Sequence, residues 1–480
     1  MYDYIIIGAG IIGTCIAREL SRFDVKVLVV DKEPDVANHQ TIANSAIIHS
    51  GHDPHEQTLK AKLCVEGNAL FDVLEQELDI PVLRTGGMIV AIGDAQERVL
   101  EGLYQRALTN QVKEASLISG DEARMREPKL SKQITKALLV PTTKVTYPWE
   151  VAFACMENAI HNGAELRLNH AVTGIVRQAH GFTVTFNGKT HVQTRQIISA
   201  AGVFSDQIAA MIEDQPLYRI TPRKGEYFVL DRKVKGFINH VIYPVPNEKG
   251  KGVLLVPQVH GNLLVGPTSV FIDDHEDLSS TAAGLAQVRR DAMKLADDIP
   301  FDKTIRTFAG IRATSTHEDF FIAESKEVEG FYHVAGIDSP GLTAAPAIAR
   351  HLIRLIRDKH TLVEKPGFDP RRKKPHAFHR LSDDEKAVLI AKDPRHGNLV
   401  CKCEKITETE IIAAIHGPLG ADTIKGIKKR ARAGSGLCQG GYCEGAVLKL
   451  IARERGLTLE KVNYYHPDTP ILVKETKVTS

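Results

Sequence analysis

Four cysteines towards the C-terminal end of the chain have the spacing of a metal site. Cys401 and Cys403 form a C-x-C pair, and 34 residues later Cys438 and Cys443 form a C-x4-C pair. Four thiolates suit tetrahedral sulfur coordination, by zinc or in an iron–sulfur cluster. A C-x-C pair is tighter than the pairs of common zinc sites, in which two to four residues separate the ligands. We therefore favour an iron–sulfur cluster over zinc, and either over four unligated thiols.

A run of basic residues precedes Cys438: Lys425, Lys428, Lys429, Arg430 and Arg432. These charges would offset the negative charge of a thiolate-ligated cluster. The alternative is that they form a solvated helix face. The other three cysteines, Cys15, Cys64 and Cys155, lie in helical patterns, and we expect them to be core residues.

The N-terminal residues have the order of a dinucleotide-binding unit. An apolar run (residues 4–7) leads into a glycine turn (8–13) and a helix (14–22). A second apolar run (25–30) follows and ends at an acid, Asp31. The acid lies 18 residues after the last glycine, close to the spacing of the dinucleotide fingerprint. The alternative is a glycine-rich turn that binds nothing.

Each residue type in this unit has a physical role. Gly8 permits the tight turn, Gly10 lets the backbone approach a pyrophosphate, and Gly13 lets the helix pack closely on the strand. The start of the helix offers free N–H groups and a positive dipole end to phosphates. Asp31 can accept hydrogen bonds from ribose hydroxyls.

His49 follows an apolar pair in a loop of small and polar residues after this unit. Its imidazole has the right ordinary pKa to accept a proton from an alcohol during oxidation. The alternative is a loop histidine that only makes hydrogen bonds. His49, His52 and His55 recur every three residues, but the Asp53-Pro54 step breaks any helix that would align them as metal ligands.

Arg312 follows a small strand-like segment at residues 308–311. A guanidinium group suits bidentate binding of a phosphate or carboxylate. The alternative is a surface ion pair, which describes most of the 61 basic residues.

Composition places the chain among ordinary globular proteins. Its 480 residues leave room for two or three domains. A hydrophobic content of 43% with 25% charged residues is typical of soluble proteins, and a net charge of +2 gives no general attraction to nucleic acid. We expect a cytoplasmic protein, because seven cysteines point to a reducing compartment and a core strand at the very start leaves no room for a secretory signal. The longest apolar stretch, residues 4–17, is too short to span a membrane.

The remaining chain predicts elements that position these residues. We expect helices at 59–78, 95–111, 150–162, 281–296 and 345–358, paired strands at 166–178 and 182–186, and an antiparallel sheet within 218–266. The segment 365–380 has three prolines, a cluster of positive charge and no hydrophobic period. It is typical of an extended linker at a domain boundary.

The first 360 residues resemble the FAD-dependent oxidoreductases of the D-amino-acid oxidase superfamily. The likeness is greatest to its branch of glycerol-3-phosphate oxidases and dehydrogenases and L-2-hydroxyglutarate dehydrogenases. Four motifs carry it in order, at residues 8–13, 44–51, 200–206 and 335–343. Residues 399–403 and 436–443 resemble the [2Fe-2S] module named after bacterioferritin-associated ferredoxin, which the large subunit of anaerobic glycerol-3-phosphate dehydrogenases also carries.

The resemblance implies an α/β fold: a discontinuous Rossmann-like FAD domain, an antiparallel β-sheet cap over the substrate (α+β), and a small, mostly helical [2Fe-2S] domain. The implied boundaries are 1–80, 145–215 and 305–362 for the FAD domain, 81–144 and 216–304 for the cap, 363–396 for a linker, 397–456 for the cluster domain and 457–480 for a tail.

The resemblance also implies roles for single residues. His49 is the catalytic base, Arg312 binds the substrate anion and assists catalysis, and Lys251 (or equally Lys249) and Ser339 are further substrate contacts. The four cysteines, Cys401, Cys403, Cys438 and Cys443, hold the cluster. The FAD contacts are Gly8, Gly10, Ile12, Gly13, Asp31, Lys32, Asn44, Ser45, Val172, Ala201, Gly202, Asp206, Gly336, Ser339, Gly341, Leu342 and Thr343.

The implied reaction is oxidation of the secondary alcohol of a small anion. The first expectation is sn-glycerol 3-phosphate to dihydroxyacetone phosphate, with electrons passing through the [2Fe-2S] cluster to an electron-accepting protein or a membrane acceptor. One alternative is an L-2-hydroxyglutarate dehydrogenase or oxidase. Another is a peroxide-forming oxidase whose cluster module is structural or a docking element, and a third is amine oxidation. Through its partner, the cytoplasmic protein could lie at the inner face of the membrane.

Overall fold

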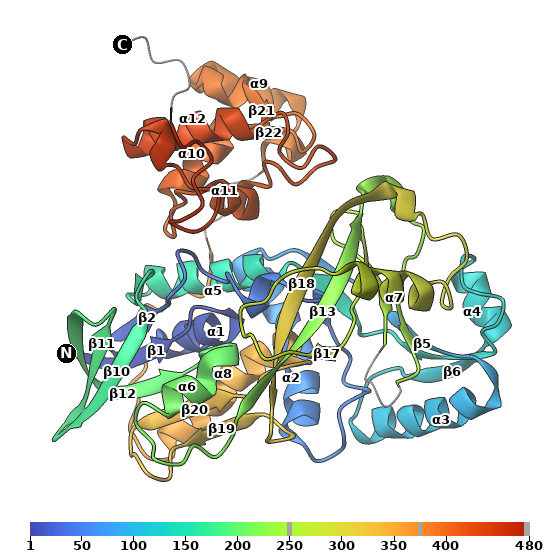
Figure 1. Ribbon diagram of the computed structural model, residues 1–480, viewed down its shortest axis with the longest axis horizontal. Helices are drawn as coiled ribbons and strands as arrows, with labels where there is room; N and C mark the ends of the chain where they lie inside the picture. Colours follow the sequence, from blue (N-terminus) through green and yellow to red (C-terminus); the bar gives the residue numbers. More distant parts are fainter. Residues whose placement is uncertain (247–251, 373–376, 475–480) are drawn as a thin grey trace. The chain divides into compact units, whose positions relative to one another are not determined.

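The computed structural model describes residues 1–246, 252–372 and 377–474. They form two compact units. The first comprises Met1–Lys32 and Ala37–Arg371, and the second comprises Glu33–Val36 and the chain from Arg372 onwards. Each unit is described by itself, and both are drawn in Figure 1.

The first sheet of unit 1 has the strand order β10-β11-β12-β1-β2-β9, and β20 pairs with β12 and with β19. The pairs of β1 with β12 and β2, of β2 with β9, and of β12 with β20 are parallel, whereas β10–β11–β12 and β19–β20 are antiparallel. The bounds are β1 Tyr2–Ile7, β2 Val27–Val30, β9 Glu165–Arg167, β10 Val172–Gln178, β11 Gly181–Phe186, β12 Thr190–Ser199, β19 Phe321–Glu324 and β20 Phe331–Ala335.

Helices accompany this sheet because its central strands are apolar on both faces. All four residues of β2 are buried, as are the last four of β1. Helix α1 packs against α5 and α8, and α2 packs against α8 (Figure 1). The bounds are α1 Ile11–Leu20, α2 Leu59–Leu78, α5 Pro148–His161, α6 Ser205–Ala209, α8 Gly341–Arg357, η1 Gln40–Ile42 and η2 Gly202–Phe204.

Two of these helices begin three or four residues earlier than the sequence pattern predicts. Helix α1 begins at Ile11, directly after Gly10, and not at Thr14. Helix α8 begins at Gly341 and not at Ala345, although Pro346 lies inside it. In both, the first turn is made of glycine-motif residues, which the hydrophobic period does not detect.

The second sheet of unit 1 is the cap, with the order β17-β13-β16-β15-β14-β5-β7-β6 and β18 paired to β13. Its pairs are antiparallel except β14 with β5. The bounds are β5 Gly87–Ala91, β6 Ser116–Ser119, β7 Lys136–Val140, β13 Ile220–Leu230, β14 Val241–Pro244, β15 Leu254–Pro257, β16 Leu263–Gly266, β17 Val270–Phe271 and β18 Thr304–Ser315.

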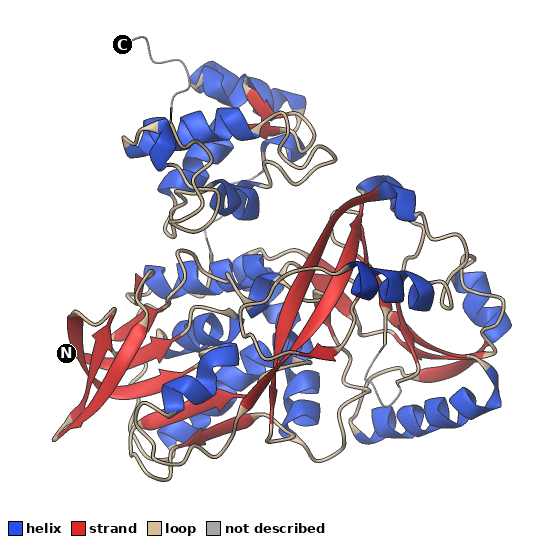
Figure 2. Ribbon diagram, in the orientation of Figure 1, coloured by secondary structure: helices blue, strands red, loops and turns tan. Residues whose placement is uncertain are grey.

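Three helices flank the cap sheet, as Figure 2 shows in blue beside the red strands: α3 Gly93–Thr109, α4 Gly120–Arg126 and α7 Ala282–Ala292. Val288 and Ala292 of α7 join Leu230, Val265 and Leu255 of the sheet in one apolar core. A small sheet of β3 Ile47–Ile48, β8 Lys144–Thr146 and β4 Val82–Leu83, and the turns η3 Arg232–Val234 and η4 Phe301–Lys303, complete unit 1.

Unit 2 is mostly helical. Its elements are η5 Phe378–Arg380, α9 Asp383–Lys392, η6 Pro394–Gly397, β21 Leu399–Cys401, β22 Ile406–Thr407, α10 Glu408–His416, α11 Ile424–Ala431, α12 Glu444–Arg455 and η7 Leu459–Lys461. Capping boxes start α9 at Ser382 and α10 at Thr407. The core includes Ile411, Ile427, Val447 and Ile451. A ten-residue helix, α9, thus occupies part of the segment expected as a linker.

The architecture agrees with the predicted fold class: an α/β unit with an antiparallel cap sheet, followed by a small helical unit. Among the described helices, none is both long and apolar enough to cross a membrane.

Candidate functional site

The turn between β1 and α1 has no room for side chains. Gly8 has a φ of +112°, and a Cβ there would lie 2.4 Å from the carbonyl oxygen of Ala200. A Cβ at Gly13 would lie 1.9 Å from the carbonyl oxygen of Gly8. Gly10 caps the helix, and Ile12 is buried in its first turn. This close backbone packing leaves the helix N-terminus available to a pyrophosphate, so the turn fits FAD.

Asp31 lies beside this turn, where one of its carboxylate oxygens accepts a hydrogen bond of 2.6 Å from the Ala9 N–H. Its neighbour Lys32 pairs with Glu276 and lies 3.8 Å from the ring centre of Phe204. Thr41 accepts a hydrogen bond of 2.9 Å from the Ile11 N–H, a contact for which the sequence carries no signal.

The loop after η1 is held by its own side chains. Asn44 donates to the carbonyls of Gln40 and Thr41 and accepts from the Ala46 N–H. The Ser45 hydroxyl lies 3.2 Å from the Tyr227 hydroxyl of the cap. These bonds fix the backbone that leads to His49.

The second glycine motif follows β12. Gly202 has a φ of +58°, and a Cβ there would lie 2.2 Å from Oε1 of Gln40, so the motif packs against the same loop. Asp206 accepts a hydrogen bond of 2.9 Å from the Ile220 N–H, so that one of its oxygens anchors the start of β13. Ala201 precedes Gly202, and Val172 opens β10 opposite Phe186.

The late glycine motif forms the start of α8. Gly336 directly follows β20 and has a φ of +66°. Ser339 lies in the following turn, and Gly341, Leu342 and Thr343 form the first helical turn. The Thr343 hydroxyl accepts a hydrogen bond of 2.8 Å from the His49 N–H and lies 3.3 Å from the Ile47 carbonyl. One side chain therefore joins the histidine loop to this helix N-terminus.

The His49 backbone and ring are both held in place. Its carbonyl accepts a hydrogen bond of 2.9 Å from Asn68, and its Nδ1 lies 3.4 Å from the Tyr243 hydroxyl. Burial raises the pKa of Tyr243, so this hydroxyl stays protonated. His52 is buried and bonded to Ser50, while His55 is exposed, so the three histidines do not form a cluster.

No sequence pattern predicts the contacts of His49 with Tyr243 and Asn68. Tyr243 and His49 are 194 residues apart, and Asn68 lies in the middle of α2. Only the tertiary fold brings them together.

Arg312 lies on β18, where its Nη1 is 3.5 Å from the Thr268 carbonyl oxygen. A Cβ at Gly225 would lie 2.9 Å from its Nη2, so the guanidinium occupies the space over this glycine. Lys251 and Lys249 lie outside the described residues.

In unit 2, the four cysteines come together as two close pairs. The Sγ atoms of Cys403 and Cys438 are 3.7 Å apart, and the thiol of Cys443 interacts with Cys401. Cys401 and Cys443 are buried, whereas Cys403 and Cys438 are half-buried. A Cβ at Gly436 would lie 2.5 Å from the Cys403 Cβ, so the loop can close only with glycine there.

Hydrogen bonds stabilise the thiolate form of one cysteine in each pair. The Cys443 thiol and the backbone N–H groups of Gly434 and Glu404 lower the pKa of Cys401 to about 6. The backbone N–H groups of Tyr442 and Gly440 lower the pKa of Cys438. Such donors also suit the sulfur atoms of an iron–sulfur cluster, whose potential they tune.

The arrangement of the four thiols as two close pairs suits a cluster with two metal ions. Two pairs of thiols suit a [2Fe-2S] cluster, which takes four cysteines over two irons.

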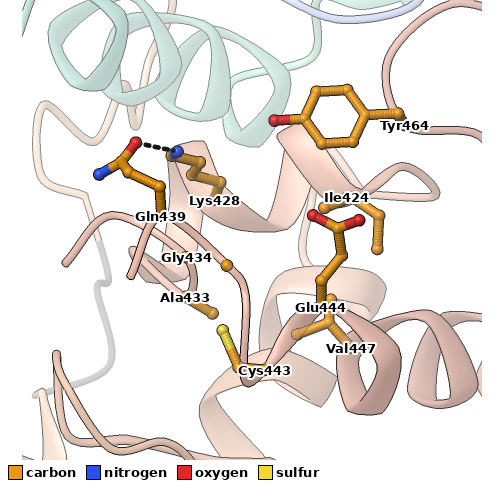
Figure 3. A pocket seen from close by; sticks show the side chains of 10 residues that line it. Ile424, Lys428, Ala433, Gly434, Gln439, Cys443, Glu444, Val447 and Tyr464 are labelled. Atoms are coloured by element: carbon orange, nitrogen blue, oxygen red, sulfur yellow. Dashed lines mark hydrogen bonds between the residues drawn. The ribbon is translucent and has the colours of Figure 1, made fainter. Parts of the chain in front are cut away.

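A small pocket borders this site, and Figure 3 shows Cys443 and Gly434 on its wall. Lys428 lies there and donates a hydrogen bond of 3.0 Å to Oε1 of Gln439, the residue after Cys438. Arg432 binds Glu404, next to Cys403, at 3.0 Å. Both cations therefore act on loops that carry the cysteines.

The other residues of the basic run have separate partners. Lys429 and Arg430 bind Asp35 of the same unit at 2.6 and 2.7 Å, and Lys425 lies over the Tyr465 ring. Lys429 is buried, so the run is not simply a solvated helix face.

Two family models match the chain. Residues 3–355 match the FAD dependent oxidoreductases, and residues 399–453 match the BFD-like [2Fe-2S] binding domain.

Among curated proteins, a glycerol 3-phosphate dehydrogenase of Caloramator mitchellensis is 40% identical over 99% of both chains. A glycerol 3-phosphate oxidase of Mycoplasma pneumoniae is 31% identical over 76% of this chain and 97% of its own. Among solved structures, the L-alpha-glycerophosphate oxidase of Mycoplasma pneumoniae with FAD bound is 30% identical, with a TM-score of 0.75 over 78% of this chain and 99% of its own.

Proposed function

Because the chain belongs to the family of FAD-dependent oxidoreductases, we propose that it oxidises sn-glycerol 3-phosphate to dihydroxyacetone phosphate. FAD and a [2Fe-2S] cluster are its cofactors. The observation that carries the proposal is the 40% identity to a glycerol 3-phosphate dehydrogenase over 99% of both chains, which includes the cluster module.

In the proposed reaction, the substrate alcohol loses a proton from oxygen and a hydride from carbon. His49 accepts the proton through Nε2, in the tautomer whose Nδ1–H donates to the Tyr243 hydroxyl oxygen 3.4 Å away. Bound FAD supplies the two-electron acceptor for the hydride. Arg312 holds the phosphate, and Thr343 and Asn68 hold the histidine loop. Lys251 and Ser339 remain proposed substrate contacts.

We infer a dehydrogenase rather than an oxidase. About a quarter of this chain has no counterpart in the Mycoplasma pneumoniae oxidase, although nearly all of that oxidase is matched. A [2Fe-2S] cluster takes one electron at a time, so a cluster module suits delivery to a one-electron acceptor. Cys401, Cys403, Cys438 and Cys443 would hold it. The proposed acceptor is a protein or a membrane-bound carrier that the cytoplasmic enzyme contacts.

An anaerobic visible spectrum of the purified holoenzyme tests the proposal. Glycerol 3-phosphate should bleach the flavin band, and electrons that reach the cluster should lower its broad absorbance as well. If only L-2-hydroxyglutarate bleaches the flavin, the proposed substrate is wrong and the proposed chemistry stands. Rapid peroxide formation in air, with the cluster absorbance unchanged, would instead indicate an oxidase with a structural or docking module.

A further inference from the structure

Arg223 faces Arg312 across two strands of the cap. They are direct partners in the antiparallel pair of β13 and β18. Side chains at directly opposed positions point to the same face of a sheet, about 4.5–5.5 Å apart at their Cβ atoms. Like charges in this arrangement repel each other, and the sheet must compensate for them.

The positive charge of Arg223 is only weakly compensated by its neighbours. Burial and the Arg312 charge lower the pKa of Arg223. Its closest carboxylate, on Asp338, lies 3.6 Å away and is also bound by Lys60 at 2.9 Å. Among the described residues, Nε of Arg223 is buried with no hydrogen-bond partner. Two guanidinium groups are thus placed opposite each other, and Arg223 has an unused donor.

The neighbouring residue provides an internal contrast. Lys224 points to the other face of β13, and its Nζ lies 2.5 Å from a carboxylate oxygen of Asp277. A buried cation of this strand therefore has its own acidic partner on one face, whereas Arg223, on the other face, shares the Asp338 carboxylate with Lys60.

The position of the pair points towards the reaction site. Asp338 directly precedes Ser339, in the turn that leads into α8. On its other side, Arg223 lies 5.8 Å from the ring centre of Phe271, its partner on β17. Arg223, Arg312, Lys60 and Asp338 together carry a net charge of +2, which matches one phosphate dianion.

We propose that Arg223 and Arg312 form a two-arginine site that binds the phosphate dianion of the substrate and selects it over a single carboxylate. This inference rests on the proposed function for the identity of the substrate. The anion site itself is a property of the two strands, so it can be tested without turnover.

The test uses the oxidised full-length holoenzyme and inorganic phosphate as the probe, with acetate for comparison, by calorimetric titration at constant ionic strength. Arg223→Gln should weaken phosphate binding about 10- to 100-fold, as expected for loss of a charge-assisted bidentate contact. Arg223→Lys should fall in between, because it keeps the charge and loses the planar fork. Acetate binding should change much less.

Two further variants make the result specific. Arg306→Gln removes an exposed charge from the same strand, β18, and should leave phosphate binding unchanged. Asp338→Asn should strengthen phosphate binding several-fold, because it removes the only negative charge of the four. This opposite sign cannot arise from general loss of folding, and FAD content checks each variant.

Steady-state kinetics complete the test. Arg223→Gln should raise KM for glycerol 3-phosphate about as much as it weakens phosphate binding, with kcat nearly unchanged. Wild-type phosphate affinity in Arg223→Gln would overturn the inference. Failure of glycerol 3-phosphate to reduce the wild-type flavin would overturn the proposed substrate instead, and the phosphate titration would still decide the role of the pair.

Discussion

In the turn after β1, which we propose to hold FAD, backbone atoms pack closely and side chains are excluded, whereas in unit 2 four cysteine sulfur atoms form the proposed cluster site and backbone N–H groups lie beside them. The first site depends on Gly8 and Gly13, where a Cβ would lie 2.4 and 1.9 Å from carbonyl oxygens. The second depends on cysteine pairs such as Cys403 and Cys438, 3.7 Å apart. Sites of the first kind fail when an atom is added, and sites of the second kind fail when a ligand is removed.

Removal of a ligand should have the largest effect. In Cys438→Ser, a hydroxyl replaces a thiolate, and we expect loss of the cluster and of electron transfer to a one-electron acceptor. Reduction of the flavin by substrate should persist at close to the wild-type rate. Iron and acid-labile sulfide analysis measures the first effect, and anaerobic stopped-flow absorbance measures the second. A normal iron content in this variant would show that Cys438 is not a ligand.

His49→Asn should have the opposite pair of effects, slowing flavin reduction and leaving the cluster intact. Without a base at this position, the rate of flavin reduction should fall about 10²- to 10⁴-fold, while iron content stays at the wild-type level. Single-turnover absorbance under anaerobic conditions is the measurement. A rate within a few-fold of wild type would leave His49 as a loop residue that only makes hydrogen bonds.

Addition of one methyl group tests whether the glycine turn depends on the exclusion of side chains. Gly13→Ala would bring its Cβ against the carbonyl oxygen of Gly8, a backbone atom that cannot move aside, and FAD content should fall several-fold. Gly102→Ala is the matched control, because Gly102 lies inside α3 and a Cβ there would meet open space. It should keep its FAD and gain up to about 1 kcal/mol of stability. Equal FAD contents in the two variants would contradict the steric argument.

The smallest expected effect is a change with pH in the stability of unit 1. Burial, together with the Lys32 charge, lowers the pKa of His39 to about 4. Below the ordinary pKa of 6.5, the unfolded chain gains a proton that the folded chain does not, so stability falls as pH drops from 6.5 towards 4. Between pH 7.5 and 5, wild type should lose up to about 2 kcal/mol more than His39→Asn. Urea unfolding at both pH values measures this, and parallel losses in the two proteins would exclude the histidine.

The sequence was most informative where chemistry is local. The glycine turn, Asp31 and the four cysteines were predicted from their spacing, because each set lies within a short segment or has a rare residue type. Helix starts were less predictable, because the first turns of α1 and α8 are made of glycine-motif residues that do not follow the hydrophobic period. The approach of His49 to Tyr243 and the pairing of Arg223 with Arg312 depend on the tertiary fold over long separations, which no local pattern encodes. Asp206 was predicted from the sequence as a cofactor contact, and the structure adds a second role that the sequence does not indicate, because its carboxylate anchors the start of β13.

The asparagine side chains at the end of α5 have a practical consequence for protein engineering. Asn158 and Asn162 donate to the carbonyl of Asp369, Asn162 also accepts from its N–H, and Lys365 donates to the Asn162 carbonyl. Residues 365–371 are therefore bound into unit 1, and a chimera cut at residue 364 would expose the asparagines. A junction after Arg371 preserves these bonds and is the position at which to exchange the electron-transfer module for another one.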